Sequence, residues 1–362
     1  MHGGGTFRTV QEAIDSAPNM SDTRYTIYVK QGVYTGQAIV GKEKQNLFLI
    51  GDGMDPTVVT GSLNIHEGKE TFDSGTLVVE GDGFIAQDMG FFNTAGPEKE
   101  QAVAVRVSGD RVVMNRCKMD AYQDTLYVHH HRQFYTNCVI TGTIDFIFGN
   151  ARVVIQSSQI IPRKPRPGQE NMITAQSASN DKRSTGIVIQ NCTILPSLDL
   201  AAANGSVKTY LGRPWGNFSR TVIMESFIGE FIDAKGWHPW KEGWPLDKLY
   251  YGEFENCGPG ANTSGRVQWD GYHVISDPLE ALNFTVAQLI DGDEWLPFVG
   301  VDYTSGLMNR RFLVKDEDNN NGMDWGVGSK LLKQFNETLP NHLIKRNGNL
   351  LSVNVGPQRN AT

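Results

Sequence analysis

The segment Val113-Met114-Asn115-Arg116-Cys117 recurs without a gap as Phe134-Tyr135-Thr136-Asn137-Cys138 and as Val154-Ile155-Gln156-Ser157-Ser158. These copies are 21 and then 20 residues apart, and a fourth, Val188-Ile189-Gln190-Asn191-Cys192, follows after a longer insertion. A period of about 20 residues made of short strands and turns is typical of a coiled solenoid. Leucine-rich repeats share this period, but their Leu/Asn pattern is absent. The repeat therefore predicts an all-β fold, a parallel β-helix.

Short apolar runs broken by Gly, Asn and Asp make up most of the chain around this repeat, and they favour strands without intervening helices. The runs are Tyr25–Lys30, Asn46–Ile50, Thr76–Val79, Val103–Val107, Arg111–Met114, Ala151–Gln156 and Gly186–Gln190. The clearest helical pattern spans Thr9 to Ala17, where Val10, Ala13 and Ile14 share one face with Ala17. We therefore expect a short N-terminal helix before the strands.

Charge and hydropathy exclude several classes of protein. The 362 residues carry 33 Lys and Arg against 40 Asp and Glu, a net charge of −7, which is unfavourable for general nucleic-acid binding. No stretch approaches the ~18 consecutive apolar residues of a membrane span. His129, His130 and His131 alternate between faces if they lie in a strand, so they cannot converge on one metal ion. No zinc-type ligand spacing is present, and we expect neither a metal nor a cofactor.

The compartment is indicated by two opposing features. The chain begins Met1-His2-Gly3-Gly4-Gly5, without the basic and apolar regions of a signal peptide. Eight Asn-X-Ser/Thr sequons, which are acceptors of N-linked glycans, favour secretion instead. They begin at Asn19, Asn191, Asn204, Asn217, Asn262, Asn283, Asn336 and Asn360. We expect a secreted glycoprotein whose leader is not part of this sequence.

The cysteines occupy informative places in the repeat. Cys117 and Cys138 have the same position in adjacent coils, so their Cα atoms should be one strand spacing, ~4.8 Å, apart. A disulfide tolerates that Cα separation. The repeat therefore predicts a Cys117–Cys138 bridge, with two buried free thiols as the alternative. Cys192 and Cys257 share no register and are expected to be unpaired.

The same register stacks two aspartates. Tyr122-Gln123-Asp124-Thr125-Leu126-Tyr127 aligns with Thr143-Ile144-Asp145-Phe146-Ile147-Phe148, and Gln101 is expected in the same column one coil earlier. Two carboxylates ~5 Å apart repel, which raises the pKa of one of them. An acid beside an ionised carboxylate suits acid–base or nucleophilic chemistry. The alternative is that both aspartates lie in turns and are exposed to solvent. The apolar residues that follow them in the sequence argue against this alternative.

A second cluster is Tyr210-Leu211-Gly212-Arg213-Pro214-Trp215. The Arg213 guanidinium could bind a carboxylate through two parallel hydrogen bonds and keep it ionised, and Trp215 offers a flat apolar face to a sugar ring. Trp237, Trp240 and Trp244 follow in the sequence and either extend an aromatic wall or pack in the core.

Four segments in the same order and spacing resemble the signature motifs of plant pectin methylesterases: Gln101–Val107, Tyr122–Tyr127, Asp145–Asn150 and Leu211–Trp215. The resemblance runs from about Gly4 to Leu307. It implies a right-handed parallel β-helix catalytic domain over residues 1–307. Residues 308–362 would then be a C-terminal extension, which we expect to be weakly ordered.

The resemblance implies a carboxylic ester hydrolase, a pectinesterase, that acts on methyl-esterified homogalacturonan in the plant cell wall. Asp145 would be the nucleophile, Asp124 the general acid and then base, and Arg213 the residue that orients Asp145. Gln101 and Gln123 would stabilise the oxyanion. Residues at substrate-binding positions would be Thr71, Phe72, Gln101, Tyr127, Phe148, Arg213, Trp215 and Trp237. The family's bridging cysteines correspond to Cys117 and Cys138. The resemblance also implies a monomer and an inhibitor protein that covers the cleft.

Other functions satisfy parts of the same pattern. Two carboxylates ~5 Å apart also suit a retaining glycosidase, and polygalacturonases and pectate lyases are β-helices too. The paired glutamines and Arg213 favour an oxyanion and a permanently ionised nucleophile instead. A lyase would need acidic calcium-binding clusters, which the sequence lacks. A non-catalytic pectin-binding protein would be expected to lose Asp124 or Asp145, and both are present.

Overall fold

The computed structural model describes residues 6–181, 185–308 and 353–355. The chain divides into one unit formed by residues 1–307 with 351–362 and a second unit formed by residues 308–350. The extension expected at 308–362 lies outside the described residues, apart from Met308 and strand β27 (Val353–Val355). No helix in the described part of the chain is long and apolar enough to cross a membrane.

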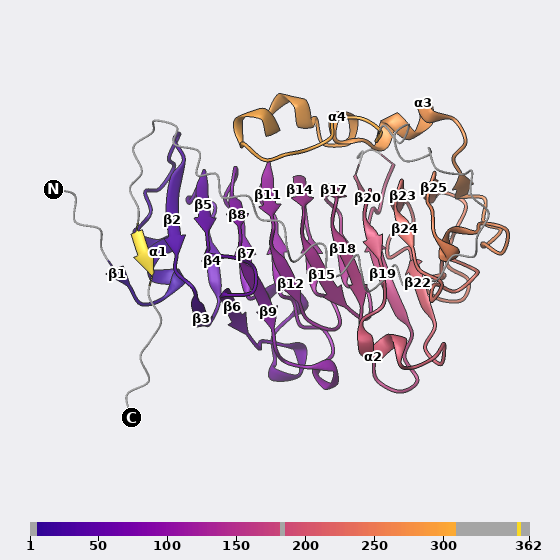
Figure 1. Ribbon diagram of the computed structural model, residues 1–362, viewed down its shortest axis with the longest axis horizontal. Coiled ribbons are helices and arrows are strands. Elements are labelled where there is room, and N and C mark those ends of the chain that lie inside the picture. The colour runs from indigo at the N-terminus through magenta and orange to yellow at the C-terminus, as the bar shows by residue number, and fades with distance from the viewer. Residues whose placement is uncertain (1–5, 182–184, 309–352, 356–362) are drawn as a thin grey trace, which may run out of the picture. The chain divides into compact units, whose positions relative to one another are not determined.

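Parallel strands of successive coils form three sheets (Figure 1). In spatial order, the twelve-stranded sheet contains β1 (Thr6–Phe7), β27, β2 (Tyr25–Val29), β5 (Leu47–Ile50), β8 (Ile85–Gln87), β11 (Val112–Asn115), β14 (Arg132–Thr136), β17 (Arg152–Gln156), β20 (Gly186–Gln190), β23 (Arg220–Met224), β25 (Tyr250–Phe254) and β26 (Tyr272–Val274). The seven-stranded sheet contains β22 (Thr209–Gly212), β19 (Asn171–Gln176), β16 (Ile147–Gly149), β13 (Leu126–Val128), β10 (Val105–Val107), β7 (Leu77–Val79) and β4 (Ala38–Val40). The eight-stranded sheet contains β24 (Phe227–Ile228), β21 (Thr193–Ile194), β18 (Gln159–Pro162), β15 (Val139–Gly142), β12 (Lys118–Asp120), β9 (Gly90–Asn93), β6 (Thr57–Gly61) and β3 (Gly32–Thr35).

The repeat in the sequence is the repeat of the coils. Val113 pairs with Phe134, Phe134 with Val154, and Val154 with Val188, as the gapless alignment predicted. The apolar runs predicted as strands are β2, β5, β7, β10, β11, β17 and β20, each within two residues of its expected bounds. The predicted parallel β-helix is therefore confirmed.

One turn recurs on successive coils. Arg116, Asn137, Ser157, Asn191 and Glu225 each directly follow a strand of the twelve-stranded sheet, with φ of 49°, 54°, 52°, 52° and 52°. Such left-handed residues reverse the backbone within a single residue. Each one redirects the chain from the twelve-stranded sheet into the eight-stranded sheet, which keeps the coil length nearly constant.

The predicted N-terminal helix is α1 (Val10–Ser16). Thr9 caps it: the Thr9 hydroxyl accepts from the Glu12 amide, and the Glu12 carboxylate accepts from the Thr9 amide. This reciprocal capping satisfies two otherwise unpaired donors. The apolar face of the helix, Val10, Ala13 and Ile14, is buried.

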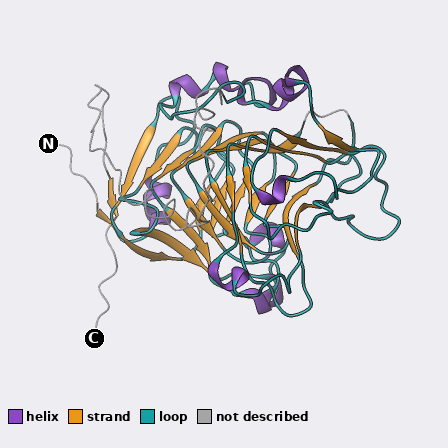
Figure 2. Cartoon of the chain, turned by 45° about the vertical axis from the view of Figure 1, so that its right-hand side comes forward, coloured by secondary structure: helices purple, strands orange, loops and turns teal. Residues whose placement is uncertain are grey.

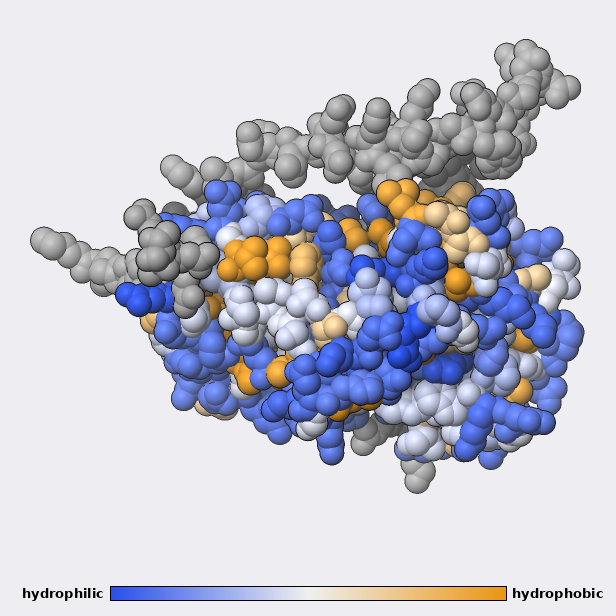
Figure 3. All heavy atoms as spheres, turned by 90° about the horizontal axis from the view of Figure 1, so that it is seen from below, coloured by the Kyte–Doolittle hydropathy of each residue, from blue (hydrophilic) through white to orange (hydrophobic). Residues whose placement is uncertain are grey.

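The other helices are short. They are α2 (Leu198–Ala201), α3 (Pro278–Ala281), α4 (Val286–Leu289), and the 3₁₀ turns η1 (Ile65–Glu67), η2 (Thr71–Asp73), η3 (Pro97–Lys99), η4 (Pro259–Ala261), η5 (Leu282–Phe284), η6 (Gly292–Glu294) and η7 (Leu296–Phe298). Figure 2 shows α3 and α4 in a segment that runs along one side of the strands. Side chains of this segment bury the outward row Val113, Phe134 and Val154 of the twelve-stranded sheet. The surface seen in Figure 3 is mostly hydrophilic, with apolar side chains in small separate groups.

Cys117 and Cys138 are neighbours as predicted, but the predicted disulfide between them is wrong. Lys118 pairs with Val139, so Cys117 and Cys138 are neighbours on adjacent coils, but both are free buried thiols. Each Sγ donates to the carbonyl oxygen two residues earlier, at 3.5 Å for Cys117 and 3.3 Å for Cys138. Stacked Cβ atoms keep the strand spacing of ~4.8 Å, whereas a disulfide requires ~3.8 Å. Cys192 and Cys257 are also free, as expected.

Candidate active site

Asp124 and Asp145 lie opposite one another at the start of two neighbouring strands. Each precedes its strand by two residues, and Leu126 of β13 pairs with Ile147 of β16. The Asp124 amide donates to the Ile144 carbonyl at 3.0 Å, which ties the two turns together. Both aspartates have left-handed backbones, with φ of 66° and 51°. Non-glycine residues rarely adopt this conformation, and Asp is among those that tolerate it best.

Gln101 does not belong to the aspartate column, so that part of the prediction was wrong. Val105 pairs with Leu126, and counting back along this register places Gln101 opposite Tyr122, with Val103 opposite Asp124. Gln101 precedes the strand, and its carbonyl oxygen accepts from the Ile65 amide at 3.3 Å. Its side-chain Oε1 is buried and has no hydrogen-bond partner. Gln123, beside Asp124, is partly buried.

Arg213 binds Asp145 through two hydrogen bonds. Nε donates to Oδ1 at 2.7 Å and Nη2 donates to Oδ2 at 2.6 Å. Arg213 directly follows β22, where its amide donates to the Thr174 carbonyl at 2.9 Å. The guanidinium also lies over the Trp240 ring, 4.4 Å from the centroid. The bidentate geometry fixes the Asp145 carboxylate in one orientation and favours its ionised form.

The two aspartates differ in their electrostatic partners. Asp124 is 8% exposed, and burial, then the charge of Asp145, raise its pKa well above the usual range. Asp145 is 6% exposed, and burial raises its pKa too, but the hydrogen bonds and charge of Arg213 oppose that rise. The proton of the pair is therefore held by Asp124, and the negative charge by Asp145.

Aromatic side chains form a row that crosses strands β13 and β16, which directly follow the two aspartates. Tyr127 stacks on Phe148 with ring centroids 4.3 Å apart and meets Phe72 edge-on at 6.4 Å. In the other direction Phe148 lies 6.1 Å from Trp215, and Trp215 stacks on Trp240 at 6.3 Å. Thr71 lies beside Phe72 in η2. The predicted substrate positions Phe72, Tyr127, Phe148 and Trp215 thus lie along this row, and Thr71 directly precedes Phe72 in the chain.

Trp237 is not part of this row. Its side chain is 0% exposed, packs edge-on against Tyr251 at 4.6 Å and donates from Nε1 to Glu253 at 3.2 Å. Trp237 forms a β-bridge with Gly212, and its side chain belongs to the interior core. Trp240, three residues later, contributes the indole at this point of the row instead.

Arg106 and His129 were not predicted as neighbours of the aromatic row, but Arg106 contacts Phe72 and His129 contacts both Phe72 and Tyr127. Arg106 is 4% exposed, lies 3.6 Å from the Phe72 centroid, and donates to Glu80 at 3.1 Å and to Ser108 at 2.9 Å. The Ser108 hydroxyl is 2.9 Å from His129 Nδ1, and burial lowers the pKa of His129 to about 4. The sequence did contain an indication of Arg106, because it is a charged residue within the apolar run Val103–Val107. In the described residues, no three His, Cys, Asp or Glu side chains form a group that could hold a metal ion.

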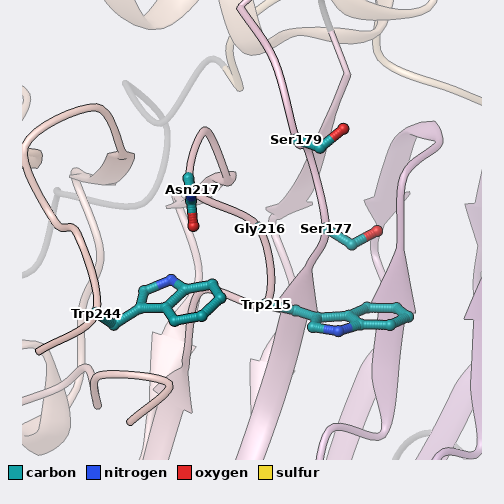
Figure 4. Close-up of a pocket in the computed structure, with 6 residues that line it drawn as sticks. All are labelled: Ser177, Ser179, Trp215, Gly216, Asn217 and Trp244. Carbon is teal, nitrogen blue, oxygen red and sulfur yellow. The ribbon is translucent and has the colours of Figure 1, made fainter. Parts of the chain in front are cut away.

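A pocket of about 380 Å³ lies at the Trp215 end of the row (Figure 4). Its lining residues are Ser177, Ser179, Trp215, Gly216, Asn217 and Trp244. Figure 4 shows the indoles of Trp215 and Trp244 on one side of it and the polar side chains of Ser177, Ser179 and Asn217 on the other. Trp244 continues the row, because its ring centroid is 6.4 Å from that of Trp240.

Known proteins resemble this chain in sequence and in structure. The family model described as Pectinesterase matches residues 1–293. A pectinesterase/pectinesterase inhibitor 18 of Arabidopsis thaliana is 56% identical over 305 residues, which are 84% of this chain and 55% of that protein. A pectinesterase 3 of Solanum lycopersicum is 54% identical over 306 residues, 84% of this chain and 56% of that protein. The chain thus spans about half the length of the named relatives it matches.

Two solved structures share the fold over most of their length. The pectin methylesterase from carrot has a TM-score of 0.83 and 48% identity, over 84% of this chain and 96% of that chain. A pectin methylesterase from Aspergillus niger has a TM-score of 0.68 and 27% identity, over 82% of this chain and 97% of that chain. With a family model that covers most of the sequence, these likenesses show that the chain belongs to the pectinesterase family.

Proposed function

We propose that this chain is a pectin methylesterase, which hydrolyses the C6 methyl esters of homogalacturonan to pectate and methanol. The observation that carries the proposal is the buried carboxyl pair, in which Arg213 holds Asp145 ionised while Asp124 keeps a proton. One group is thereby ready to act as a nucleophile and the other as an acid. The family relationship supports the same reaction.

In the first step, an Asp145 oxygen attacks the ester carbonyl carbon. The carbonyl electrons move onto oxygen, and in this proposal the side-chain amides of Gln101 and Gln123 donate hydrogen bonds to the oxyanion. The C–O bond to the methoxy group then breaks, and Asp124 protonates the departing methanol. Preorganised donors of this kind are worth about 10²–10³ in rate.

In the second step, water hydrolyses the anhydride formed between Asp145 and the galacturonic acid carbonyl. Asp124, now ionised, takes a proton from the water, and the remaining hydroxyl bonds to the carbonyl carbon. The bond to Asp145 breaks, which restores the Asp145 carboxylate under Arg213. The product acid then ionises, and the enzyme returns to its starting protonation state.

The aromatic row would bind the pectin chain across the site. The ring contacts run in series from Phe72 through Tyr127 and Phe148 to Trp215, which suits an extended polymer rather than a compact molecule. We assign catalysis to residues 1–307. We further propose a secreted monomer of the plant cell wall, whose cleft is covered by an inhibitor protein, as the family resemblance implies.

The test is methanol release from highly methyl-esterified pectin, with reducing ends followed in the same tube. The parent chain should release methanol without new reducing ends, and Asp145→Asn, which keeps the side-chain volume, should abolish the release. New reducing ends would assign the chain to the depolymerases instead. Absence of both products from the correctly folded parent would contradict an enzymatic role on pectin.

A further inference from the structure

We propose that Glu100 is a positioning residue for Gln101, one of the two amides assigned above to the oxyanion. The strained backbone of Glu100 sets the direction of the Gln101 side chain, and the Glu100 carboxylate, shared by Arg166 and His66, holds that backbone in place. The positioning role rests on the esterase function proposed above. It accounts for the placement of a group that the coil ladder does not position.

The backbone of Glu100 has an unusual conformation. Its φ is 57° and its ψ is −130°, whereas left-handed residues have ψ of about +30 to +60°. Glycine reaches positive φ readily, but a residue with a Cβ does so at a cost. Strained residues of this kind persist only where their surroundings hold them, and they cluster at functional sites. Glu100 ends η3 and directly precedes Gln101, so its conformation sets the direction in which the chain enters Gln101.

The direction of the Gln101 side chain depends on its backbone. Its Oε1 is buried and has no hydrogen-bond partner, so this oxygen does not fix the amide. The backbone is tied on both sides instead. The Ile65 amide donates to the Gln101 carbonyl at 3.3 Å, and the Ala102 amide donates to the Gln123 carbonyl at 3.2 Å. The second bond joins the two glutamine segments on adjacent coils.

Two loops hold the Glu100 carboxylate. Arg166 Nη2 donates to Oε1 at 3.1 Å, and His66 Nε2 lies 3.5 Å from Oε2. Arg166 lies between β18 and β19, and His66 lies in η1. The Glu100 side chain is 37% exposed, and one ion pair at such a site contributes little to stability. Contacts from two separate loops nevertheless oppose relaxation of the residue between them.

The experiment measures kcat and KM for methanol release from highly methyl-esterified pectin by the parent and three Glu100 variants. Glu100→Ala removes the carboxylate but keeps the strain, so the backbone should relax and misplace Gln101. Its kcat should fall about 10–10²-fold with an unchanged KM, as for a contact made only in the transition state. Glu100→Gly reaches positive φ without strain and should restore part of kcat. Glu100→Gln still accepts from Arg166 and should retain most of kcat.

A double-mutant cycle tests whether Glu100 acts through Gln101. Gln101→Ala alone should lose about 10²–10³-fold in kcat. Adding Glu100→Ala to Gln101→Ala should cause no further loss, because the effects of coupled residues do not add. The matched control is Glu98→Ala, which removes the other carboxylate near Arg166, 3.5 Å away on a 76% exposed side chain. This control should leave kcat unchanged.

The strain itself has a readout that needs no activity. Glycine is normally less favourable than alanine in a folded chain, but alanine is the less favourable residue where φ is positive. The melting temperature of Glu100→Gly should therefore exceed that of Glu100→Ala, by roughly 2–4 °C. An equal or lower melting temperature for Glu100→Gly would show that residue 100 is not strained, and would overturn the positioning role.

Three kinetic results would also overturn it. They are an unchanged kcat in Glu100→Ala, a rise in KM that accompanies the loss of kcat, and a further loss when Glu100→Ala is added to Gln101→Ala. Failure of the proposed function would look different. A folded parent that releases no methanol would refute the esterase and the positioning role with it, whereas an active parent with an unaffected Glu100→Ala would refute the positioning role alone.

Discussion

At the scale of single residues, the environments of Asp124 and Asp145 differ because Arg213 forms hydrogen bonds with Asp145. Arg213 binds both oxygens of Asp145, whereas Asp124 is buried with the Asp145 charge nearby. The same residue type therefore holds a proton in one position and a charge in the other.

Replacing Asp124 with Asn should reduce methanol release by about 10²–10⁴-fold, because Asn cannot transfer the proton.

The Asp124→Asn change should also stabilise the fold at neutral pH. The raised pKa of Asp124 means that its contribution to stability is fully present below the unfolded value of ~3.9 and is lost as pH rises through the folded value. Asn cannot ionise, so the variant does not lose this stability as the pH rises. Melting temperatures over a pH series should show a gain at neutral pH that disappears in acid; a lower melting temperature at neutral pH would contradict the assignment.

Arg213→Lys should keep the positive charge but lose the two parallel hydrogen bonds. Misplacing a reacting group by ~1 Å costs about 10²-fold in rate, and we expect a loss of that size in kcat. The pKa of Asp145 should rise further, because Arg213 opposes the effect of burial. The acid limb of the pH–rate profile should therefore move to higher pH. An unchanged acid limb would show that Arg213 does not hold Asp145 ionised.

At the scale of elements, the coil spacing decides both the carboxyl pair and the state of the thiols. Stacking on adjacent coils brings Asp124 beside Asp145, and the same stacking keeps Cys117 and Cys138 apart as free thiols. A ladder spacing of ~4.8 Å suits a carboxyl pair but is too wide for Cβ atoms joined by a disulfide.

A reducing agent should therefore leave the melting temperature of the chain unchanged. Native disulfides typically contribute about 2–5 kcal/mol, so loss of a Cys117–Cys138 bridge would be easily detected. Alkylation of the unfolded, non-reduced chain should modify all four cysteines. A mass two alkyl groups short, together with a lower melting temperature after reduction, would contradict the free thiols.

At the scale of the whole molecule, the net charge of −7 opposes binding to a polyanion. De-esterified pectin carries a carboxylate on every galacturonate, so long-range repulsion should weaken binding at low ionic strength. We expect the chain to pass through a column of immobilised pectate without retention. Retention that is released by salt would show a local basic surface that outweighs the net charge.

The sequence by itself determined the coil. A near-constant repeat of about 20 residues places equivalent residues on top of one another, so Val113, Phe134 and Val154 could be aligned without coordinates. The aspartate pair followed from the same alignment, because Asp124 and Asp145 each lie two residues before a paired strand. The capped helix α1 was equally local, since its periodicity and its Thr9 cap are adjacent in the chain.

Only the tertiary structure decided the contacts that the coil period does not control. Gln101 lies before its strand, where a loop rather than the ladder sets its position. Trp237 points into the core and Trp240 does not, because a bridge to Gly212 turns the first residue inward. The bond from Arg213 to Asp145 joins residues 68 apart. Periodicity fixes which residues stack, but the direction of a side chain from a loop depends on long-range packing that no local pattern encodes.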